Sequence, residues 1–416
     1  MATIPPRPPH PLALRALMES GRRLAGAIGL LLIVAADTEA QKGDRGSVDA
    51  PRLALGFAVD TTVVPATTWG VDPALAARPA VVRLWRDYLA VRTDSSKRGS
   101  FWSAADRRLA PDPDLALTSA DYIGSASAVL IEALPLVAGD SARWVLRTVY
   151  VGGGTASRPG LLAVERVHVV REDGRWALTR PAVADTAGWR RERVGVLEFI
   201  VHPSLSFDRR RAEDTARWVD ETARRFGVAD PAPISYFQLP NLEAAWRVAG
   251  LDWAVDTDRV GGRAYTRARI VLAADPRFGE AYRHEIAHVL LSSWTAGAPA
   301  FVGEGVAYWL GGARGVPFPA MMGDLANFLA RHPAIGLRAV LEGKYGGPAA
   351  SAQFPSVAGL FELAHRRGGD AGVRRLVEAA RRERPTPETI AAALALSPGE
   401  LETAWRALVA SYRASS

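Results

Sequence analysis

Two histidines four residues apart, with a glutamate next to the first, are the residues of this sequence best suited to bind a metal. They form the segment His284-Glu285-Ile286-Ala287-His288. On a helix, residues four apart lie on the same face one turn from each other, so both imidazoles can reach one ion. Glu285 would lie about 100° round the helix from His284, beside the ion. The spacing therefore predicts a metal site in which Glu285 acts as the base on a metal-bound water.

A third metal ligand is expected from a carboxylate farther along the chain. A catalytic zinc site holds three protein ligands and keeps one position open, so two histidines leave it one short. The sequence has seven histidines and no cysteine, which excludes thiolate ligands. Sixteen residues after His288, Glu304 lies in the apolar segment Phe301–Trp309, which we predict to be a second helix. A Glu304 side chain that faces His284 and His288 would complete the set.

The neighbours of the motif argue against a chance match on a solvated helix face. Ile286, Val289, Leu290 and Leu291 are all apolar. A helix with this composition is expected to be buried, and burying polar groups is costly unless something satisfies them. A bound metal would satisfy the two histidines and the carboxylate.

Strands and helices are expected to alternate before the motif, and helices are expected to follow it. The expected elements are a strand at Val194–Val201, a helix at about 209–226, a strand at Pro233–Gln238, a helix from about Asn241, and a strand within Ala264–Ala273 after the turn Gly261-Gly262. Asp275-Pro276 predicts the start of the motif helix, because Asp caps free amides and Pro is preferred at the first helical position. Later helices are expected near Ser356, Asp370, Thr386 and Ser397, the last with Glu400 in a capping box.

The motif, followed by Glu304-Gly305, resembles the gluzincin zinc peptidases, and specifically the family called peptidase MA-like. The resemblance covers about residues 195–412, with a sheet and active-site helix in 195–293 and a helical part in 294–412. It implies zinc bound by His284, His288 and Glu304, with Glu285 as the catalytic base. It also implies hydrolysis of peptide bonds in a peptide or protein substrate.

Related gluzincins commonly stabilise the oxyanion with a tyrosine or histidine from a downstream helix, and here the candidates are Tyr345 and His365. Where the family often has a tyrosine, this chain has Phe354. We expect Arg267–Ala273 to be the edge strand that pairs with an extended peptide. Tyr308, four residues after Glu304, is expected either to support a ligand or to be a core residue.

The first 40 residues are predicted to be an export signal. Arg22 and Arg23 precede a 13-residue apolar run, Leu24–Ala36. This run is shorter than the roughly 20 residues of a membrane-spanning helix, so a cleaved leader is favoured over a permanent anchor or a buried helix. A start at Met18 would give a compact basic region before the run. We therefore expect an exported protein, whether periplasmic, extracellular or on the cell surface.

Residues 41–76 are interpreted as a linker, and residues 77–190 as an α+β domain. A helix over Val81–Leu89 precedes strand-like runs at Trp144–Val151 and Leu161–Val170, and Asp173-Gly174 predicts a hairpin turn. This order over 77–182 resembles the nuclear-transport-factor-2-like (NTF2-like) families. The expected fold class is α+β: an NTF2-like domain, then a gluzincin-type domain with a small mixed sheet and a C-terminal helical part.

The formal charge of +7 comes mostly from scattered arginines, which indicates a solvated surface. Weak association with an anionic surface is the alternative, and no nucleic-acid partner is expected. The sequence leaves the oligomeric state open. It favours an exported zinc endopeptidase. The alternatives are a catalytically weak, zinc-containing binding module whose N-terminal domain captures a ligand, and a protein whose metal only staples helices together.

Overall fold

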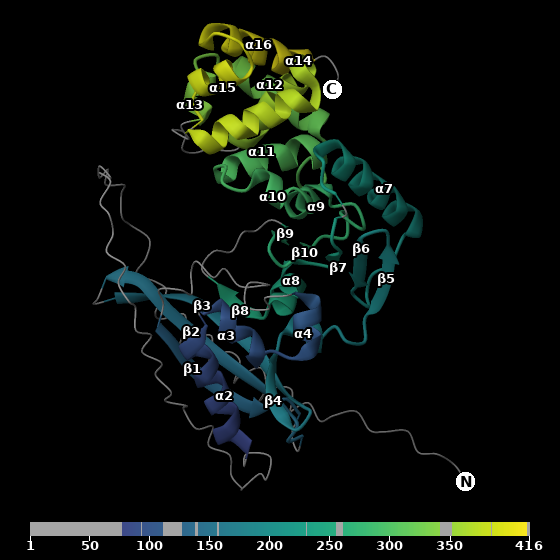
Figure 1. Cartoon of the computed structure of the whole chain (residues 1–416), viewed down its shortest axis with the longest axis vertical. Helices are drawn as coiled ribbons and strands as arrows, with labels where there is room; N and C mark the ends of the chain where they lie inside the picture. Colours follow the sequence, from purple (N-terminus) through teal and green to yellow (C-terminus); the bar gives the residue numbers. More distant parts are fainter. Residues whose placement is uncertain are drawn as a thin grey trace, which may run out of the picture. The chain divides into compact units, whose positions relative to one another are not determined.

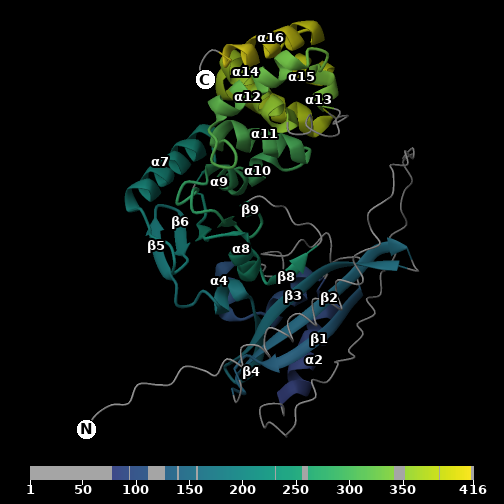
Figure 2. The same cartoon turned by 180° about the vertical axis from the view of Figure 1, so that it is seen from behind.

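The chain folds into two sheets and a C-terminal helical region, as the computed structural model shows (Figures 1 and 2). The residues described are 77–92, 94–110, 127–137, 140–155, 158–229, 231–254, 261–341, 352–383 and 385–413. This arrangement confirms the predicted α+β class. The predicted leader and linker, residues 1–76, lie outside the described residues.

The first sheet has five antiparallel strands. They are β1 (Ser127–Pro135), β2 (Arg143–Thr155), β3 (Arg158–Glu172), β4 (Arg175–Thr179) and β8 (Leu251–Ala254), which pairs with β3. The predicted turn at Asp173-Gly174 joins β3 to β4, and both residues have the positive φ of a type I′ turn, 50° and 76°. The late strand β8 joins this sheet although 71 residues separate it from β4.

Helix α2 (Arg78–Val91) covers the first sheet with the apolar face that the sequence predicts. Val81, Trp85 and Tyr88 are buried in one cluster with residues of β1 to β4. The described part of this region also holds three short helices and a 3-10 turn: α3 (Ser95–Arg98), η2 (Gly99–Phe101), α4 (Ala104–Leu109) and α6 (Pro181–Ala184). The resemblance to NTF2-like families stays a prediction.

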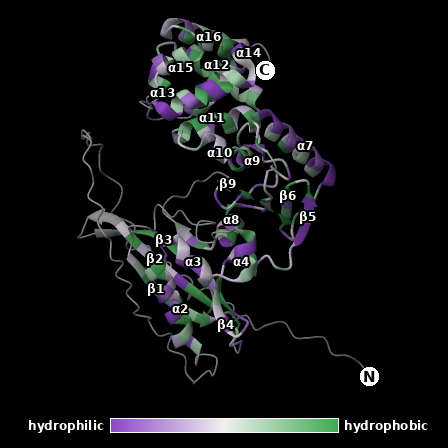
Figure 3. Cartoon of the chain, in the orientation of Figure 1, coloured by the Kyte–Doolittle hydropathy of each residue, from purple (hydrophilic) through white to green (hydrophobic). Residues whose placement is uncertain are grey.

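The second sheet has the strand order β5-β6-β7-β10-β9. Its strands are β5 (Arg190–Val194), β6 (Leu197–Val201), β7 (Ile234–Gln238), β10 (Ile270–Ala273) and β9 (Gly262–Tyr265). The three central strands are parallel, and β5 and β9 are antiparallel to their neighbours. Parallel neighbours need a crossover, which the helices α7 (Arg209–Phe226) and α8 (Leu242–Ala249) supply. Figure 3 shows β5 to be largely hydrophilic, as expected for an exposed edge.

Two strand predictions in this sheet were wrong. The stretch Val194–Val201 is not one strand, because Gly195 has a φ of 58° and turns the chain from β5 into β6. The expected edge strand Arg267–Ala273 is also not an edge: β10 lies between β7 and β9, and all four of its residues are buried. The edge is β9, which the turn at Thr266–Arg269 folds back onto β10.

The helix that carries the motif is α9 (Arg283–Leu290), and it begins later than Asp275-Pro276 predicts. The Asp275 carboxylate accepts a hydrogen bond from the amide of Arg277, only two residues on, and so closes a local turn. Gly279, with a φ of 49°, then carries the backbone away from a helical path. The predicted cap therefore forms a turn, and α9 starts after Tyr282.

Among the described residues, seven further helices form the C-terminal region. They are α10 (Ser292–Thr295), α11 (Ala300–Gly311), α12 (Phe318–Arg331), α13 (Leu337–Leu341), α14 (Gln353–Arg382), α15 (Pro387–Ala393) and α16 (Pro398–Ser411). The predicted capping box of Ser397 and Glu400 is present, and α14 is interrupted at Gly368-Gly369. One hydrophobic core links these helices to α7, α9 and the second sheet. Within the described ranges, no helix is both long and apolar enough to cross a membrane.

Candidate metal centre

Helix α9 places His284 and His288 on one face, one turn apart, as the four-residue spacing predicts. The opposite face carries Ile286, Val289 and Leu290, which are buried in the core. Helix α11 packs against α9, and Gly311 at its end permits a close approach. A Cβ at Gly311 would lie 2.4 Å from the backbone nitrogen of His284. The core and this close contact together fix the histidine face toward α11.

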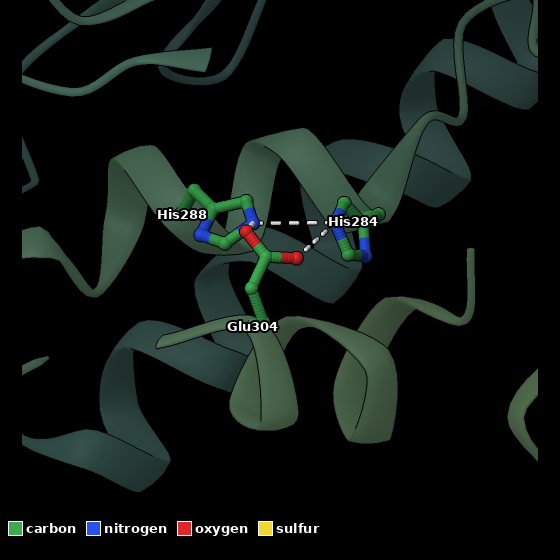
Figure 4. A group of neighbouring side chains, drawn as sticks. All are labelled: His284, His288 and Glu304. Atoms are coloured by element: carbon green, nitrogen blue, oxygen red, sulfur yellow. Dashed lines mark hydrogen bonds and ion pairs between the residues drawn. The ribbon is translucent and has the colours of Figure 1, made fainter. Parts of the chain in front are cut away.

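Glu304 on α11 completes a group of three potential metal ligands with His284 and His288 (Figure 4). The two Nε2 atoms are 3.2 Å apart, and the Glu304 oxygens lie 3.6 Å from His284 Nε2 and 3.4 Å from His288 Nε2. Four ligands placed tetrahedrally at 2.0–2.2 Å from an ion are about 3.3–3.6 Å from one another. The separation of the two imidazole nitrogens is close to this spacing. The two Glu304 distances belong to different carboxylate oxygens, Oε2 beside His284 and Oε1 beside His288, and one ligand atom from each of the three residues lies within 4.8 Å of the others. The three side chains therefore form a possible metal site.

A backbone carbonyl sets the orientation of the His284 ring. His284 Nδ1 lies 2.7 Å from the carbonyl oxygen of Gly312, and a carbonyl can only accept, so Nδ1 carries the proton. In the neutral ring, Nε2 then presents its lone pair to Glu304 and His288. This partner on the far ring nitrogen is typical of metal-binding histidines.

His284 and Glu304 shift each other's pKa. Burial favours a higher pKa for the Glu304 carboxyl, but hydrogen bonds with His284 and His288 outweigh it and lower this pKa to about 2. Burial disfavours a charged His284, yet its interactions with Glu304 and Glu285 raise its pKa overall. A carboxylate held ionised beside two imidazoles is a favourable site for a cation.

The Glu304-Gly305 pair has a packing explanation. Helix α11 lies against α14, and a Cβ at Gly305 would come within 2.4 Å of Val357 and 3.0 Å of Phe361. Only glycine lets the two helices meet at this distance. Because Gly305 follows Glu304 directly, this contact determines where the carboxylate lies relative to α9.

A cavity of about 460 Å³ opens onto the three ligands, and Glu285 lines it beside them. Tyr282, which precedes α9, lines the same cavity. Burial raises the pKa of its phenol, and the charge of Glu285 and a hydrogen bond with that side chain raise it further. Tyr282 therefore stays protonated and can donate to the Glu285 carboxylate. Gly262 of β9 makes room for the tyrosine ring, since a Cβ there would lie 1.9 Å from it.

The other predicted residues have different positions. Tyr345 lies outside the described residues. Among the described residues, those that line the cavity do not include His365 on α14. Its Nε2 atom lies 3.6 Å from Asp370 Oδ1, and its ring packs against Trp309. Phe354 and Tyr308 both line the cavity, and the Tyr308 ring packs edge-on against His284. Tyr308 thus touches a ligand of the site and also packs against the hydrophobic core, so both of its expected roles remain open.

Residues of the site that the sequence did not predict include Gly312, Tyr282, Arg263 and Arg314. The glycine pair Gly311-Gly312 after an apolar helix was a usable signal, since paired glycines indicate close backbone approach. The other three carry no local pattern that separates them from ordinary surface residues. They enter the site through the turn before α9, the edge strand β9 and the turn after α11.

No family model, curated protein or solved structure matches this chain. What is established for the site is its geometry: His284, His288 and Glu304 form a possible metal site at the floor of a cavity.

Proposed function

We propose that this protein is a zinc-dependent peptidase whose metal is held by His284, His288 and Glu304. The observation that carries the proposal is the group of two imidazole nitrogens, 3.2 Å apart, and one carboxylate whose two oxygens lie 3.6 and 3.4 Å from them, at a cavity that Glu285 also lines. Two histidines and a glutamate are a ligand set of catalytic zinc sites, and the three donors leave a fourth position free for water or substrate.

Zinc in this position would polarise a peptide carbonyl and lower the pKa of a water molecule. Glu285 lines the cavity next to the ligands and is the group placed to take the proton from that water. It then passes the proton to the leaving amine. Tyr282 lines the cavity with Glu285, and its protonated phenol can donate to that carboxylate and so orient the base.

The substrate is proposed to bind along β9. This strand ends the second sheet in the described residues, and Gly262, Arg263 and Ala264 line the cavity. An extended peptide can pair with the free edge through its backbone, which places successive carbonyls along the cavity. Such pairing reads the backbone, so it suits a protein or peptide substrate.

Glu285→Gln tests the role of the base. The variant should keep its zinc, because Glu285 is not among the three ligands, and should lose peptide cleavage by at least about 10²-fold, the usual contribution of general base catalysis. Cleavage of a quenched fluorescent peptide library and zinc content are measured on the same samples. Glu243→Gln, an exposed position on α8, is the matched control.

Full activity in Glu285→Gln would remove Glu285 from the mechanism. If a chelator unfolds the wild-type protein and no peptide is cleaved, the metal only staples helices together. Cleavage that a chelator abolishes in a protein that stays folded supports the peptidase.

A further inference from the structure

Two arginines line the cavity together with the proposed metal ligands and base. Arg263 lies on the edge strand β9, and Arg314 lies in the turn after α11, so the two come from different elements. Both side chains are exposed, and neither forms an ion pair within the described ranges. The carboxylates of the cavity, Glu285 and Glu304, already have roles as base and ligand. Arg263 lies over the Tyr265 ring, 5.5 Å from its centroid, but this contact uses none of its N–H donors, so both cations remain available to a substrate.

The backbone holds Arg314 in an unfavourable conformation. Ala313 and Val316 exchange two backbone hydrogen bonds, of 3.0 and 2.8 Å, around Arg314 and Gly315. These two central residues have φ angles of 52° and 80°, as in a type I′ turn. Such turns favour Gly, Asn or Asp at the first central position, so arginine goes against the local preference.

Arg269 and Arg314 share a positive φ but differ in what their side chains contact. Arg269 also has a positive φ, 56°, but its guanidinium donates to the carbonyls of Ala232 and Pro233 and so stabilises the fold. Arg314 has no such hydrogen bond among the described residues and instead faces the cavity. A strained backbone conformation that is not offset by a stabilising contact is typical of residues kept for function.

The turn also has a fixed relation to the metal centre. Gly312, two residues before Arg314, accepts the hydrogen bond from His284. Arg314, Tyr308 and Phe354 line both the metal-centre cavity and a neighbouring one of about 720 Å³ between α12 and α14. Arg314 therefore lies at the boundary that the two cavities share.

We propose that Arg314, assisted by Arg263, binds a carboxylate of the substrate, so that the site selects acidic peptides. This rests on the proposed peptidase function and adds the substrate class to it. A guanidinium forms paired hydrogen bonds with a carboxylate, which give both affinity and orientation. The carboxylate belongs either to an acidic side chain or to the C-terminus of the peptide.

Peptide binding tests the proposal without requiring cleavage. Glu285→Gln protein loaded with zinc is titrated with fluorescent peptides, and binding is followed by anisotropy. One pair of peptides differs by Glu against Gln, and a second pair by a free against an amidated C-terminus. The pair that shows a preference identifies the source of the carboxylate. The acidic member should bind about tenfold more tightly, and added salt should reduce the difference.

Variants of Arg314 separate charge from backbone conformation. Arg314→Asn tolerates the positive φ and removes the charge, so it should fold normally and lose most of the tenfold preference. Arg314→Lys should keep part of the preference. The matched control is Arg210→Gln, which removes an exposed arginine of α7 and should leave binding unchanged.

The proposal is overturned if neither pair shows a preference, if the acidic peptides do not bind, or if the preference persists in the Arg314→Asn, Arg263→Gln double variant. Failure of the peptidase function has a different signature. The wild-type protein would then cleave none of the four peptides, while the anisotropy measurements would still report whether the arginines select a carboxylate.

Discussion

Adding one methyl group at Gly305 should separate α11 from α14 and displace the Glu304 ligand. A Cβ at this position would lie 2.4 Å from Val357 Cγ1 and 3.0 Å from Phe361 Cε2, and both side chains are buried. Neither has space to move aside without shifting a helix. Overpacking of this kind costs about 1–3 kcal/mol. Gly305→Ala should therefore destabilise the protein and weaken metal binding.

Gly303 provides the matched control, because it also adjoins Glu304 in α11. A Cβ at Gly303 meets no described atom within 4 Å. Both substitutions gain the same helix propensity, about 1 kcal/mol for Gly to Ala, so the difference between them isolates the clash. Gly303→Ala should be neutral or stabilising, and the two variants should differ by about 1–3 kcal/mol.

Urea unfolding of the metal-free proteins, followed by circular dichroism, gives the free energies of unfolding. Removing the metal matters, because bound metal would add its own stabilisation. Val357→Ala combined with Gly305→Ala should recover part of the loss, since Val357 is the nearer obstacle. Equal stability of Gly303→Ala and Gly305→Ala, or no recovery in the double variant, would refute the packing explanation.

Two further substitutions test the support of the site. Gly312 has a φ of 70°, and a Cβ there would lie 2.2 Å from the Val316 carbonyl oxygen, so Gly312→Ala should shift the carbonyl that orients His284. Zinc affinity, measured by competition with a chromophoric chelator, should fall roughly 10–100-fold, and unchanged affinity would contradict this role. Glu362 accepts hydrogen bonds from Trp309 and Arg366, which outweigh burial and lower the pKa of its carboxyl below 4.5. The stabilisation that these two hydrogen bonds give to the folded protein is thus present above pH 4.5 and is lost as the pH falls through the lowered pKa of Glu362. Glu362→Gln should cost about 1 kcal/mol at pH 7, and this difference should shrink in acid denaturation series; a difference independent of pH would contradict the assignment.

The sequence predicts the local parts of the site well. His284 and His288 meet because of helix geometry alone, and their spacing is visible in the sequence. Glu304 lies on another helix, yet the apolar segment around it and the adjoining Gly305 identify it. The capping box at Ser397 and the turn at Asp173-Gly174 are equally local, and both are confirmed.

The wrong predictions have different causes. Gly195 splits Val194–Val201 locally into two strands, whereas the position of β10 and the start of α9 depend on the path of other segments. Whether β10 is an edge is decided by pairing with β7 and β9, which the composition of β10 does not reveal. Asp275 can cap a helix or close a turn, and the path through Gly279 decides between them. The Gly312 carbonyl is a backbone group, so no residue type in the sequence indicates its role. Such features follow from tertiary structure, which outweighs local propensity.

The metal content of the purified protein tests the central claim most directly. Mass spectrometry should find one zinc ion per wild-type chain, and His288→Ala and Glu304→Gln should each remove most of it while Glu285→Gln retains it. A wild-type protein that binds no zinc, or ligand variants that keep a full equivalent, would contradict the assignment of His284, His288 and Glu304 as the metal centre.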